Sequence, residues 1–432
     1  MIALVDANSF FCSVEKVFHP GLRGKPVCVL SSNDGNIVAL TPEAKALGLR
    51  RGDPLFKVRH IVEQHQVALF SSNMMLYAAM SRRVIRILRR NILHVENYSI
   101  DESFCYLDGY ERFYSLEAYM RGVVEQIRTW TDIPVSVGIA ATKTLAKVGS
   151  KFAKQYPGYQ SVCLIDTEEK RRKALSLFPL DEVWGIGRST LSELNYLGIS
   201  TPLQFADRSE GWVRSHFHLP GVRTWMELNG KPCIDTAEVM RNQSVCTSRS
   251  FGEMVEDLPH LKEAVIHFAG SCANKLRGQR TIAGAVTVFL TSNRFRQDLQ
   301  QYSNAATRTL LVRTSDTLEI VNRALDALKE IYRPGIWYKK CGVVLSDITP
   351  DKAVTWDLFD PITNRKERDE LMATIDRLNQ RYGLKSVHLA GDGSFSSKGP
   401  HDEPAQQPWR VKSEHRSGDY LTDINGLLTI DI

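Results

Sequence analysis

Short apolar runs alternate with amphipathic stretches through the first 165 residues of the chain. The runs at 2–5, 27–30 and 135–139 have the length and composition of buried strands, whereas 116–129 shows helical spacing of apolar positions. Strands and helices mixed in this way predict an α+β domain. The turn-rich residues 31–35 and the short elements of 36–71 predict a small inserted lobe that divides this domain in two.

The rest of the chain divides into three further parts. Residues 166–232 are helical and charged, and 233–242 have the polar composition of a linker. A helix pattern at 261–276 and strand patterns at 283–290 and 309–314 then predict a second small α+β domain. Beyond residue 350 the chain is rich in Asp, Gly, Ser and Pro, which is typical of a tail.

Composition narrows the class of protein. With 432 residues and 43% hydrophobic content, the chain can bury two to four ordinary cores. It has no basic leader and no run near the roughly 18 apolar residues of a membrane span, so we expect a cytoplasmic protein without a membrane segment. Its eight cysteines are scattered and lack the spacing of a zinc site.

The charge distribution suggests an anionic partner. The net charge is +6 with a pI near 8.8, a mild excess that suits a polyanion. Lys143, Lys147, Lys151 and Lys154 recur on one face of a predicted helix. A row of cations without interleaved acids repels itself, so we expect an anion at this face; a solvated basic face is the alternative.

Three carboxylates stand where strand patterns end. Asp101 and Glu102 close the short β-like stretch 98–102, and Asp6 follows the run 2–5. Acids from two strand ends can hold a pair of Mg²⁺ ions about 3.5–4 Å apart, which clamp the attacking and leaving oxygens in phosphoryl transfer. The pattern therefore favours nucleotidyl transfer, although Asp101 and Glu102 taken by themselves are more typical of residues that open a turn or cap a helix.

A glycine turn in 183–188 predicts contact with a nucleic-acid backbone. Val-Trp-Gly-Ile-Gly-Arg followed by Leu-Gly-Ile at 197–199 has the form of a helix-hairpin-helix. Gly185 and Gly187 let N–H groups at a helix N-terminus approach phosphate, so we predict DNA binding there and at Arg188; a plain helical hairpin is the alternative. In the second domain, we expect strands to expose Arg249, Arg294 and Arg296 to DNA.

Taken in order, these segments resemble the Y-family translesion DNA polymerases, and within them the UmuC-type catalytic subunit of bacterial DNA polymerase V. The resemblance runs from residue 1 to about 390 and rests on 5–11, 98–102, 138–147 and 183–187. It implies an error-prone DNA-directed DNA polymerase of the SOS response that adds dNTPs to the primer 3′ end of primer-template DNA. It also implies a multidomain α+β right hand, with its parts as follows: a ferredoxin-like palm (1–10 and 72–165), small fingers (11–71), a helix-hairpin-helix thumb (166–232), an α+β little finger (243–350) and a partner-binding C-terminal tail (351–432).

The resemblance also implies roles for residues near the acids. The three carboxylates and the Ala7 carbonyl would hold two Mg²⁺ ions. Phe11 falls at the steric gate, where an aromatic ring packs under the sugar and excludes a ribose 2′-hydroxyl; close relatives usually carry Tyr there. Phe10 beside it is also a candidate nucleotide-binding residue, but because consecutive strand residues face opposite ways, we expect only one of the two rings to point at the site.

Two basic residues are implied in triphosphate binding. Lys154 corresponds to a family lysine that holds the triphosphate, and Lys45 to a basic residue of the fingers with the same role. The segment 40–42 reads Leu-Thr-Pro, where UmuC-type relatives carry Arg-Asn-Ala. This departure puts phosphate contacts through that loop in doubt.

The implied partners are a UmuD-type accessory dimer, the RecA filament and the sliding clamp (beta). Residues 355–359 read Thr-Trp-Asp-Leu-Phe and resemble a clamp-docking peptide, with Trp356, Leu358 and Phe359 as its apolar anchors and Thr355 in place of the usual Gln. Two other functions stay open from residues alone. One is a nucleotidyl cyclase, which also uses paired acids and two metals, and the other is a DNA-binding scaffold with an inactive palm.

Overall fold

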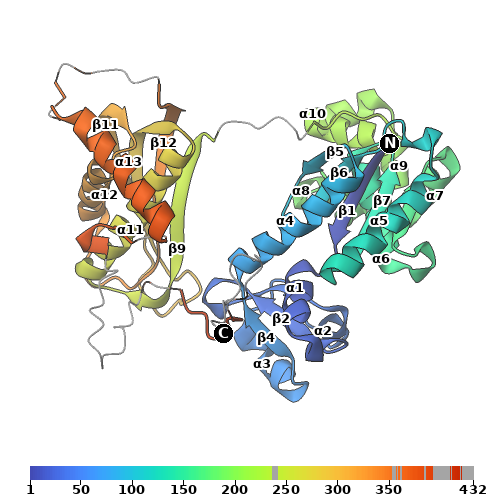
Figure 1. Cartoon of the computed structure of the whole chain (residues 1–432), viewed down its shortest axis with the longest axis horizontal. Helices are drawn as coiled ribbons and strands as arrows, with labels where there is room; N and C mark the ends of the chain where they lie inside the picture. The colour runs from blue at the N-terminus through green and yellow to red at the C-terminus, as the bar shows by residue number, and fades with distance from the viewer. Residues whose placement is uncertain are drawn as a thin grey trace, which may run out of the picture. The chain divides into compact units, whose positions relative to one another are not determined.

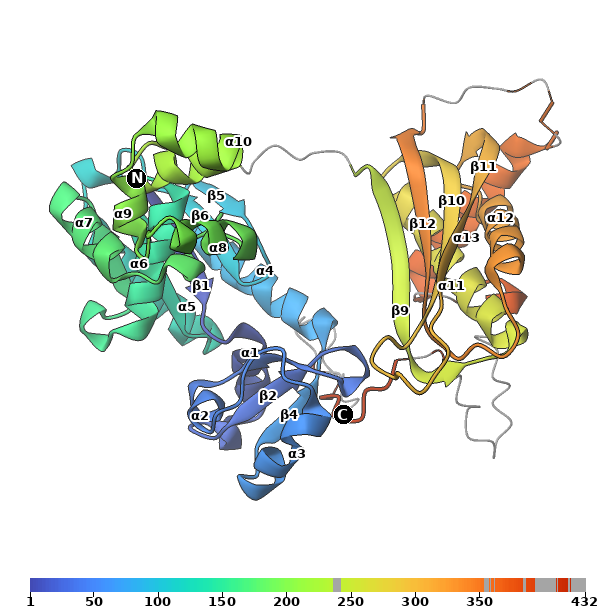
Figure 2. The same cartoon turned by 180° about the vertical axis from the view of Figure 1, so that it is seen from behind.

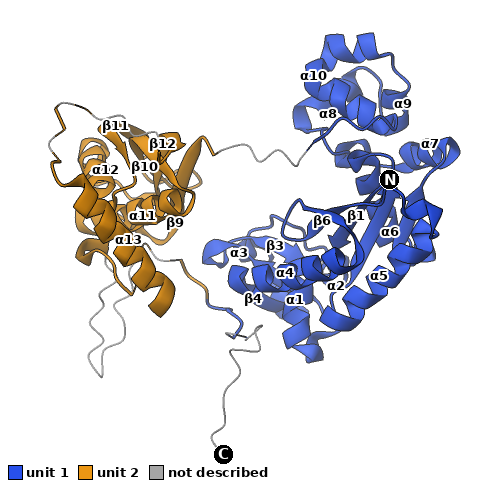
Figure 3. Ribbon diagram, turned by 45° about the horizontal axis from the view of Figure 1, so that its top comes forward, with its two compact units in different colours: residues 1–239, 414–432 blue, residues 240–413 orange. Residues whose placement is uncertain are grey.

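The computed structural model describes residues 1–235, 242–352, 357, 359–360, 362–383, 386–392, 409, 411–418 and 420. The chain forms two compact units, the first made of residues 1–239 and 414–432 and the second of residues 240–413 (Figure 3). Within the described ranges, no helix is both long and apolar enough to cross a membrane.

The first unit is built on a five-stranded sheet in the order β5–β6–β1–β7–β8. The central strand β1 pairs antiparallel with both neighbours, and β7 pairs parallel with β8. Helices pack on both faces of the sheet, which explains the almost continuous apolar run of β1. The strands are β1 (Ile2–Ala7), β5 (His94–Asn97), β6 (Glu102–Tyr106), β7 (Val135–Ala140) and β8 (Val162–Ile165).

Alternation along β1 decides which side of the sheet carries the acids. Ala3 and Val5 share a core with α4 (Met74–Asn91) and α5 (Leu116–Thr131). Ile2 and Leu4 share a different core with α6 (Lys143–Gln155), on the opposite face. Because side chains alternate along a strand, Asp6 continues the Ile2–Leu4 face and lies on the α6 side.

Two glycines bring α6 directly onto the sheet. A Cβ at Gly138 in β7 would lie 2.0 Å from the Ala146 carbonyl oxygen and 2.1 Å from the Ser150 nitrogen. Gly149 faces Gly138 from the helix, and a Cβ there would be 3.0 Å from the Gly138 Cα. The motif 138–147 therefore permits a helix-to-strand approach that no larger residue allows, and it sets α6 beside the acids.

The lobe predicted from 36–71 is a small three-stranded sheet in the order β3–β2–β4, and it begins earlier than predicted, because its central strand β2 is the apolar run 27–30. It has its own core, which includes Leu30, Ile37 and Leu55, and α1 (Phe10–Phe18) joins it to the five-stranded sheet (Figure 1). Its elements are β2 (Val27–Leu30), β3 (Ile37–Leu40), α2 (Pro42–Ala46), α3 (Leu55–Gln64) and β4 (Ala68–Ser71).

Residues 166–232 are helical, as the sequence predicts. The helices are α7 (Glu168–Leu177), α8 (Arg188–Tyr196), α9 (Pro202–Ala206) and α10 (Glu210–Leu228). They share the core of Ile2, Leu4 and α6, so this part of the chain packs on the face of the sheet that carries Asp6 (Figure 2).

The second unit is a four-stranded antiparallel sheet in the order β11–β10–β12–β9 that packs against helices. Its elements are β9 (Ser244–Val255), α11 (Leu258–Gly278), β10 (Thr281–Ser292), β11 (Ser303–Thr314), α12 (Thr317–Ile331), β12 (Tyr338–Pro350) and α13 (Arg365–Tyr382). The α+β class is thus confirmed in both units. The C-terminal part differs from the separate tail predicted for 351–432, since α13 and the buried Trp409 belong to this unit.

Candidate active site

The three predicted acids meet at the edge of the β1–β6 pair. The antiparallel register sets Asp6 directly opposite Glu102, so their side chains share one face. Asp101 stands in the turn before β6, and the Ala7 N–H donates to its carbonyl oxygen at 2.9 Å. The sequence prediction was wrong in one respect: the two acids do not close a strand, because 98–101 forms the tight turn between β5 and β6, in which Asp101 is the last residue, and Glu102 is the first residue of β6.

Ser99 fixes this turn. Its hydroxyl donates to Asp101 Oδ1 at 2.5 Å and accepts the Glu102 N–H at 3.0 Å. The Asp101 carboxylate is therefore held by its own turn, while Asp6 and Glu102 engage lysines of α6.

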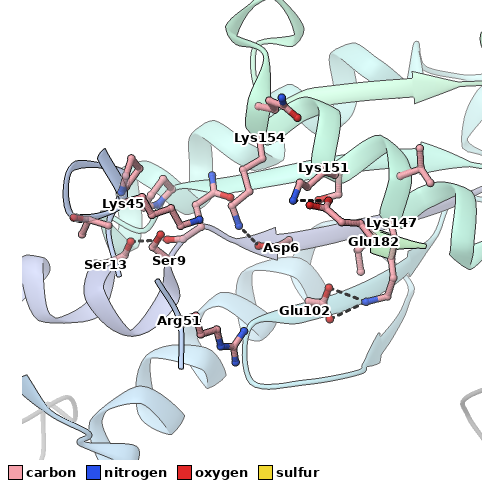
Figure 4. Close-up of a pocket in the computed structure, with 18 of the residues that line it drawn as sticks. Asp6, Ser9, Ser13, Lys45, Arg51, Glu102, Lys147, Lys151, Lys154 and Glu182 are labelled. Atoms are coloured by element: carbon pink, nitrogen blue, oxygen red, sulfur yellow. Dashed lines mark hydrogen bonds and ion pairs between the residues drawn. The ribbon is translucent and has the colours of Figure 1, made fainter. Parts of the chain in front are cut away.

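The lysine row of α6 finds its anionic partners within the chain. Each lysine pairs with a carboxylate from a different element, and Figure 4 shows three of these pairs. The pairs are Lys143–Glu96 at 2.9 Å, Lys147–Glu102 at 2.8 Å, Lys151–Glu182 at 2.6 Å and Lys154–Asp6 at 3.1 Å. Two of the four partners are predicted metal ligands, so α6 supplies cations where the acids concentrate negative charge.

Asp6 carries the electrostatic strain of the cluster. Desolvation by burial raises the pKa of Asp6, and the charges of Glu102 and Asp101 raise it further, against the lowering effect of Lys154. The charged form of such a carboxylate is stabilised by a nearby cation, whether that cation is an ammonium group or a metal ion.

The donor set fits a divalent cation in chemistry. Three carboxylates and the Ala7 carbonyl are hard oxygen donors of the kind that Mg²⁺ prefers, and all four residues line one cavity. In the arrangement seen here, no three His, Cys, Asp or Glu side chains of the described residues converge as a metal cluster. The carboxylates instead contact side chains of the protein: Asp101 accepts from Ser99, Glu102 pairs with Lys147, and Asp6 pairs with Lys154. A metal ion has to replace these contacts in order to bind.

Two adjoining cavities open at the acids. One, of about 810 Å³, is lined by Asp6, Ala7, Phe10, Phe11, Lys45, Asp101, Glu102 and Lys154, the complete set of predicted metal and nucleotide residues. The other, of about 1140 Å³, shares Asp6, Glu102, Lys45 and Lys154 and extends along Lys147 and Lys151 to Trp184. The structure therefore brings together residues that the sequence separates by more than a hundred positions.

The expectation that only one of the two phenylalanines reaches the site is not met, because both Phe10 and Phe11 line the cavity of about 810 Å³. They belong to helix α1, not to a strand, so they diverge by about 100° around a helix axis rather than by strand alternation. Phe10 is 4% exposed and packs in the core. Phe11 is half-buried at the cavity and stacks on Tyr77, with ring centroids 4.5 Å apart and planes at 15°.

The atypical segment 40–42 has a structural role. Thr41 caps α2 by accepting the Ala44 N–H at 3.3 Å, and it also accepts the Val27 N–H at 3.2 Å. Its side chain is buried, with Pro42 at the first helical position. The segment thus starts the helix that presents the exposed Lys45 to both cavities.

Arg51 is a cavity residue that sequence reasoning missed. It lines both cavities, and Figure 4 shows it across the cavity from the α6 lysines. The available signal was the pair Arg50–Arg51 before Gly52, in a turn that carries no periodic pattern.

The predicted hairpin has the backbone that its glycines suggest. Gly185 has φ of +99°, and a Cβ there would lie 2.2 Å from Thr224 Oγ1, so only glycine fits. Gly187 is the N-cap of α8 and Arg188 its first residue, and all three residues are exposed. Free N–H groups of the first turn of α8 therefore face outward.

The predicted DNA-contacting arginines of the second unit are not all on strands. Arg249 is exposed on β9, opposite Cys341 in the register. Arg294 and Arg296 lie in the loop after β10, which corrects the prediction, because β10 ends at Ser292. Arg296 is paired with Asp298 at 2.6 Å. Of the clamp-like peptide, Trp356 and Leu358 fall outside the described residues, and Phe359 is 81% exposed.

Family models cover most of the chain. The impB/mucB/samB family matches residues 5–151, and the C-terminal domain of that family matches 242–358. A domain of unknown function matches 369–430.

Full-length relatives and solved structures agree with these matches. Protein ImpB of Salmonella typhimurium is 42% identical over 98% of this chain and 97% of its own. Protein UmuC of Salmonella typhimurium strain LT2 is 38% identical over the whole of both chains. A Y-family DNA polymerase chimera of Dbh and Dpo4 is 21% identical, with a TM-score of 0.63 over 81% of this chain and all of the chimera.

Proposed function

Because this chain belongs to the impB/mucB/samB family of Y-family translesion DNA polymerases, we propose that Asp6, Asp101 and Glu102 carry its catalysis with two Mg²⁺ ions. The chain is an error-prone DNA-directed DNA polymerase of SOS mutagenesis and DNA repair. The observation that carries the proposal is the single cavity that holds all three acids, the Ala7 carbonyl, Phe11 and two lysines.

The acids are the metal ligands of the proposal. When bound, the two ions lower the pKa of the primer 3′-hydroxyl and neutralise charge on the incoming triphosphate. Asp6 and Glu102 face each other across the β1–β6 register, and Asp101 follows from the same turn, so one sheet edge supplies all the carboxylates. Lys147 and Lys154 hold Glu102 and Asp6 as counter-ions and release them to the metal.

Lys154, Lys45 and Arg51 bind the triphosphate in this proposal. All three line both cavities, and they reach the space beside the acids from α6, α2 and the loop before α3. Lys154 then has two alternating partners, Asp6 before substrate binding and phosphate oxygens afterwards. Arg51 offsets the absence of an arginine from the segment 40–42.

Phe11 is the steric gate of the proposal. Its ring lines the cavity of the acids and is held against the buried Tyr77 ring. A ring fixed in this way clashes with a ribose 2′-hydroxyl and tolerates deoxyribose, which supports selection of dNTPs without the phenol oxygen of a tyrosine.

DNA contacts and partners follow from the same premise. Gly185, Gly187 and Arg188 contact the phosphate backbone through the exposed N-terminus of α8, while Arg249, Arg294 and Arg296 add contacts from the second unit. A UmuD-type accessory dimer, the RecA filament and the sliding clamp are the proposed partners. The exposed Phe359 supports clamp docking. A cytoplasmic location stays a prediction.

Primer extension on an abasic template tests the metal assignment. The assay compares wild type, Asp101→Ala and, as a matched control, Glu111→Gln, an exposed palm acid away from the cavities. Each is assayed with Mg²⁺ and dNTPs, first alone and then with the clamp, the accessory dimer and RecA filament.

We expect extension by wild type and the control, none by Asp101→Ala, and equal DNA affinity in all three. Unchanged extension by Asp101→Ala would contradict the metal assignment. If wild type binds DNA but extends the primer under none of these conditions, the result would favour the alternative of a DNA-binding scaffold with an inactive palm.

A further inference from the structure

A short C-terminal segment packs on the first unit. Residues 414–418 and 420, here named the C-terminal strap, lie beside β4 and α1 (Figures 1 and 2). The Ser71 N–H donates to the His415 carbonyl at 2.9 Å, and the His415 N–H donates to Ser71 Oγ at 3.0 Å. Arg416 forms a parallel bridge with Ser71 at the end of β4. The strap thus extends the edge of the small sheet.

Ser417 connects the strap to a buried carboxyl group. Its side chain is 7% exposed, and its hydroxyl donates to Glu15 Oε1 at 3.2 Å and accepts the Asn73 amide at 3.1 Å. Glu15 is fully buried, and the Tyr77 hydroxyl donates to the same Oε1 at 2.7 Å. Glu15 Oε2 has no hydrogen-bond partner among the described residues. One carboxyl oxygen therefore joins the strap to Tyr77.

The same face of α1 leads from the strap to the cavity. Phe11, Glu15 and Phe18 are spaced i, i+4 and i+7, so they share one side of the helix. Phe18 stacks on Tyr420 of the strap, with centroids 4.5 Å apart and planes at 6°. Phe11 stacks on Tyr77, which is fully buried.

We propose that the C-terminal strap positions the steric gate through Ser417, Glu15 and Tyr77, and so sets sugar selection from the far end of the chain. The inference rests on the proposed role of Phe11 and gives a role to part of the segment 369–430. Ser417 and Tyr77 act as positioning residues, since neither is a metal or triphosphate ligand of the proposal. Because a packed interior transmits displacement from one side chain to the next, a change at Ser417 can shift the Phe11 ring, and a misplacement of about 1 Å is enough to change rates strongly.

The test is single-nucleotide insertion by the full-length chain, with dCTP and CTP opposite template G. Three substitutions are compared: Ser417→Ala removes the hydroxyl, Ser417→Thr retains it, and Glu414→Gln changes an exposed strap residue. We expect Ser417→Ala to lower the ratio of kcat/KM for dCTP over CTP about fivefold, the value of one net hydrogen bond. The loss comes from faster CTP insertion, while kcat/KM for dCTP stays within about twofold and Ser417→Thr and Glu414→Gln resemble wild type.

A double-mutant cycle shows whether the effect passes through Tyr77. Tyr77→Phe keeps the stacked ring but removes the hydrogen bond to Glu15. As a single substitution it should therefore lower the ratio of kcat/KM for dCTP over CTP, and adding Ser417→Ala to it should not change that ratio further. Additive effects would overturn the proposed route.

Phe11→Ala distinguishes a failure of the steric-gate assignment from a failure of the proposed role of the C-terminal strap. If it admits CTP while Ser417→Ala lowers insertion of dCTP and CTP equally, or leaves the ratio unchanged, the strap has only a structural role and the inference fails. If Phe11→Ala itself leaves sugar selection unchanged, the gate assignment fails, and the inference with it.

Discussion

Removing the lysine that holds Glu102 should make the stability of the first unit depend on Mg²⁺. Lys147 binds both Glu102 oxygens, at 2.8 and 2.9 Å, and the two side chains are only 19% and 21% exposed. Its ammonium group also lies over the Tyr98 ring, 4.7 Å from the centroid. Lys147→Met retains most of the aliphatic stem and deletes the charge, so it removes the ion pair together with the cation–π contact.

The magnitude follows from burial. Exposed pairs contribute up to about 1 kcal/mol, and breaking a fully buried pair costs about 3–5 kcal/mol, so about 2 kcal/mol is expected for this half-buried pair. Without Lys147, Glu102 faces Asp6 across the register, while Lys154 remains paired with Asp6. For a unit of this size, about 2 kcal/mol lowers Tm by roughly 4–8 °C in EDTA.

Mg²⁺ should restore much of this loss, because a metal that binds only the folded state stabilises it and no longer has to displace an ammonium from Glu102. Lys151→Met is the matched control, since Lys151 lies on the same helix and pairs with Glu182, which is not a predicted ligand. That pair is 45% and 39% exposed, so its loss should cost at most about 1 kcal/mol, independent of Mg²⁺. Equal Tm losses in the two variants, with the same response to Mg²⁺, would refute the reasoning.

Two further predictions concern stability alone. Burial raises the pKa of the Glu15 carboxyl against the lowering effects of Tyr77, Ser417 and His19, so the stabilising contribution of this group is full below the ordinary glutamate pKa and is lost as pH rises through the raised value. In urea titrations from about pH 5 to about pH 8, Glu15→Gln should therefore lose less unfolding free energy than wild type, and parallel losses would count against the buried carboxyl. Gly138→Ala should cost more than about 3 kcal/mol in thermal unfolding, because its Cβ meets backbone atoms that cannot yield. Gly122→Ala, in α5 with nothing within 4 Å, should be neutral or stabilising by about 0.5–1 kcal/mol, so similar effects at the two glycines would contradict this view of α6 packing.

The apolar pattern predicted the elements well where each is buried on a definite face. The run 27–30 is β2, 135–139 lies within β7, and 116–129 lies within α5. The pattern also placed Asp6 at a strand end, because a charged residue after a buried run has to emerge from the core. The pattern did not show that Glu102 begins a strand. The start of β6 is set by the turn in which Ser99 accepts the Glu102 N–H, and a hydrogen bond of this kind leaves no periodic signal in the sequence.

The lysine row shows what the sequence can predict about electrostatics. Four cations on one helix face without interleaved acids favour nearby anions over a solvated face, and the spacing alone supported that expectation. The sequence did not identify those anions, because each comes from a different element of the first unit: Glu96, Glu102, Glu182 and Asp6. The close packing of α6 on Gly138 helps to bring the lysines within reach of them.

Glu15 is the residue whose meaning most needed the structure. An acid at the i+4 position between Phe11 and Phe18 breaks the apolar face of α1, and local rules assign such a residue to solvent. It is buried instead, because Tyr77 and Ser417 reach it from α4 and from the far end of the chain. A polar residue on an otherwise apolar buried face lowers stability, and such departures from the local pattern are expected at functional sites. Here the polar group connects the C-terminal strap to the ring stacked on Phe11, and a search of the apolar face of α1 for its one acid is the sequence signal that would have found it.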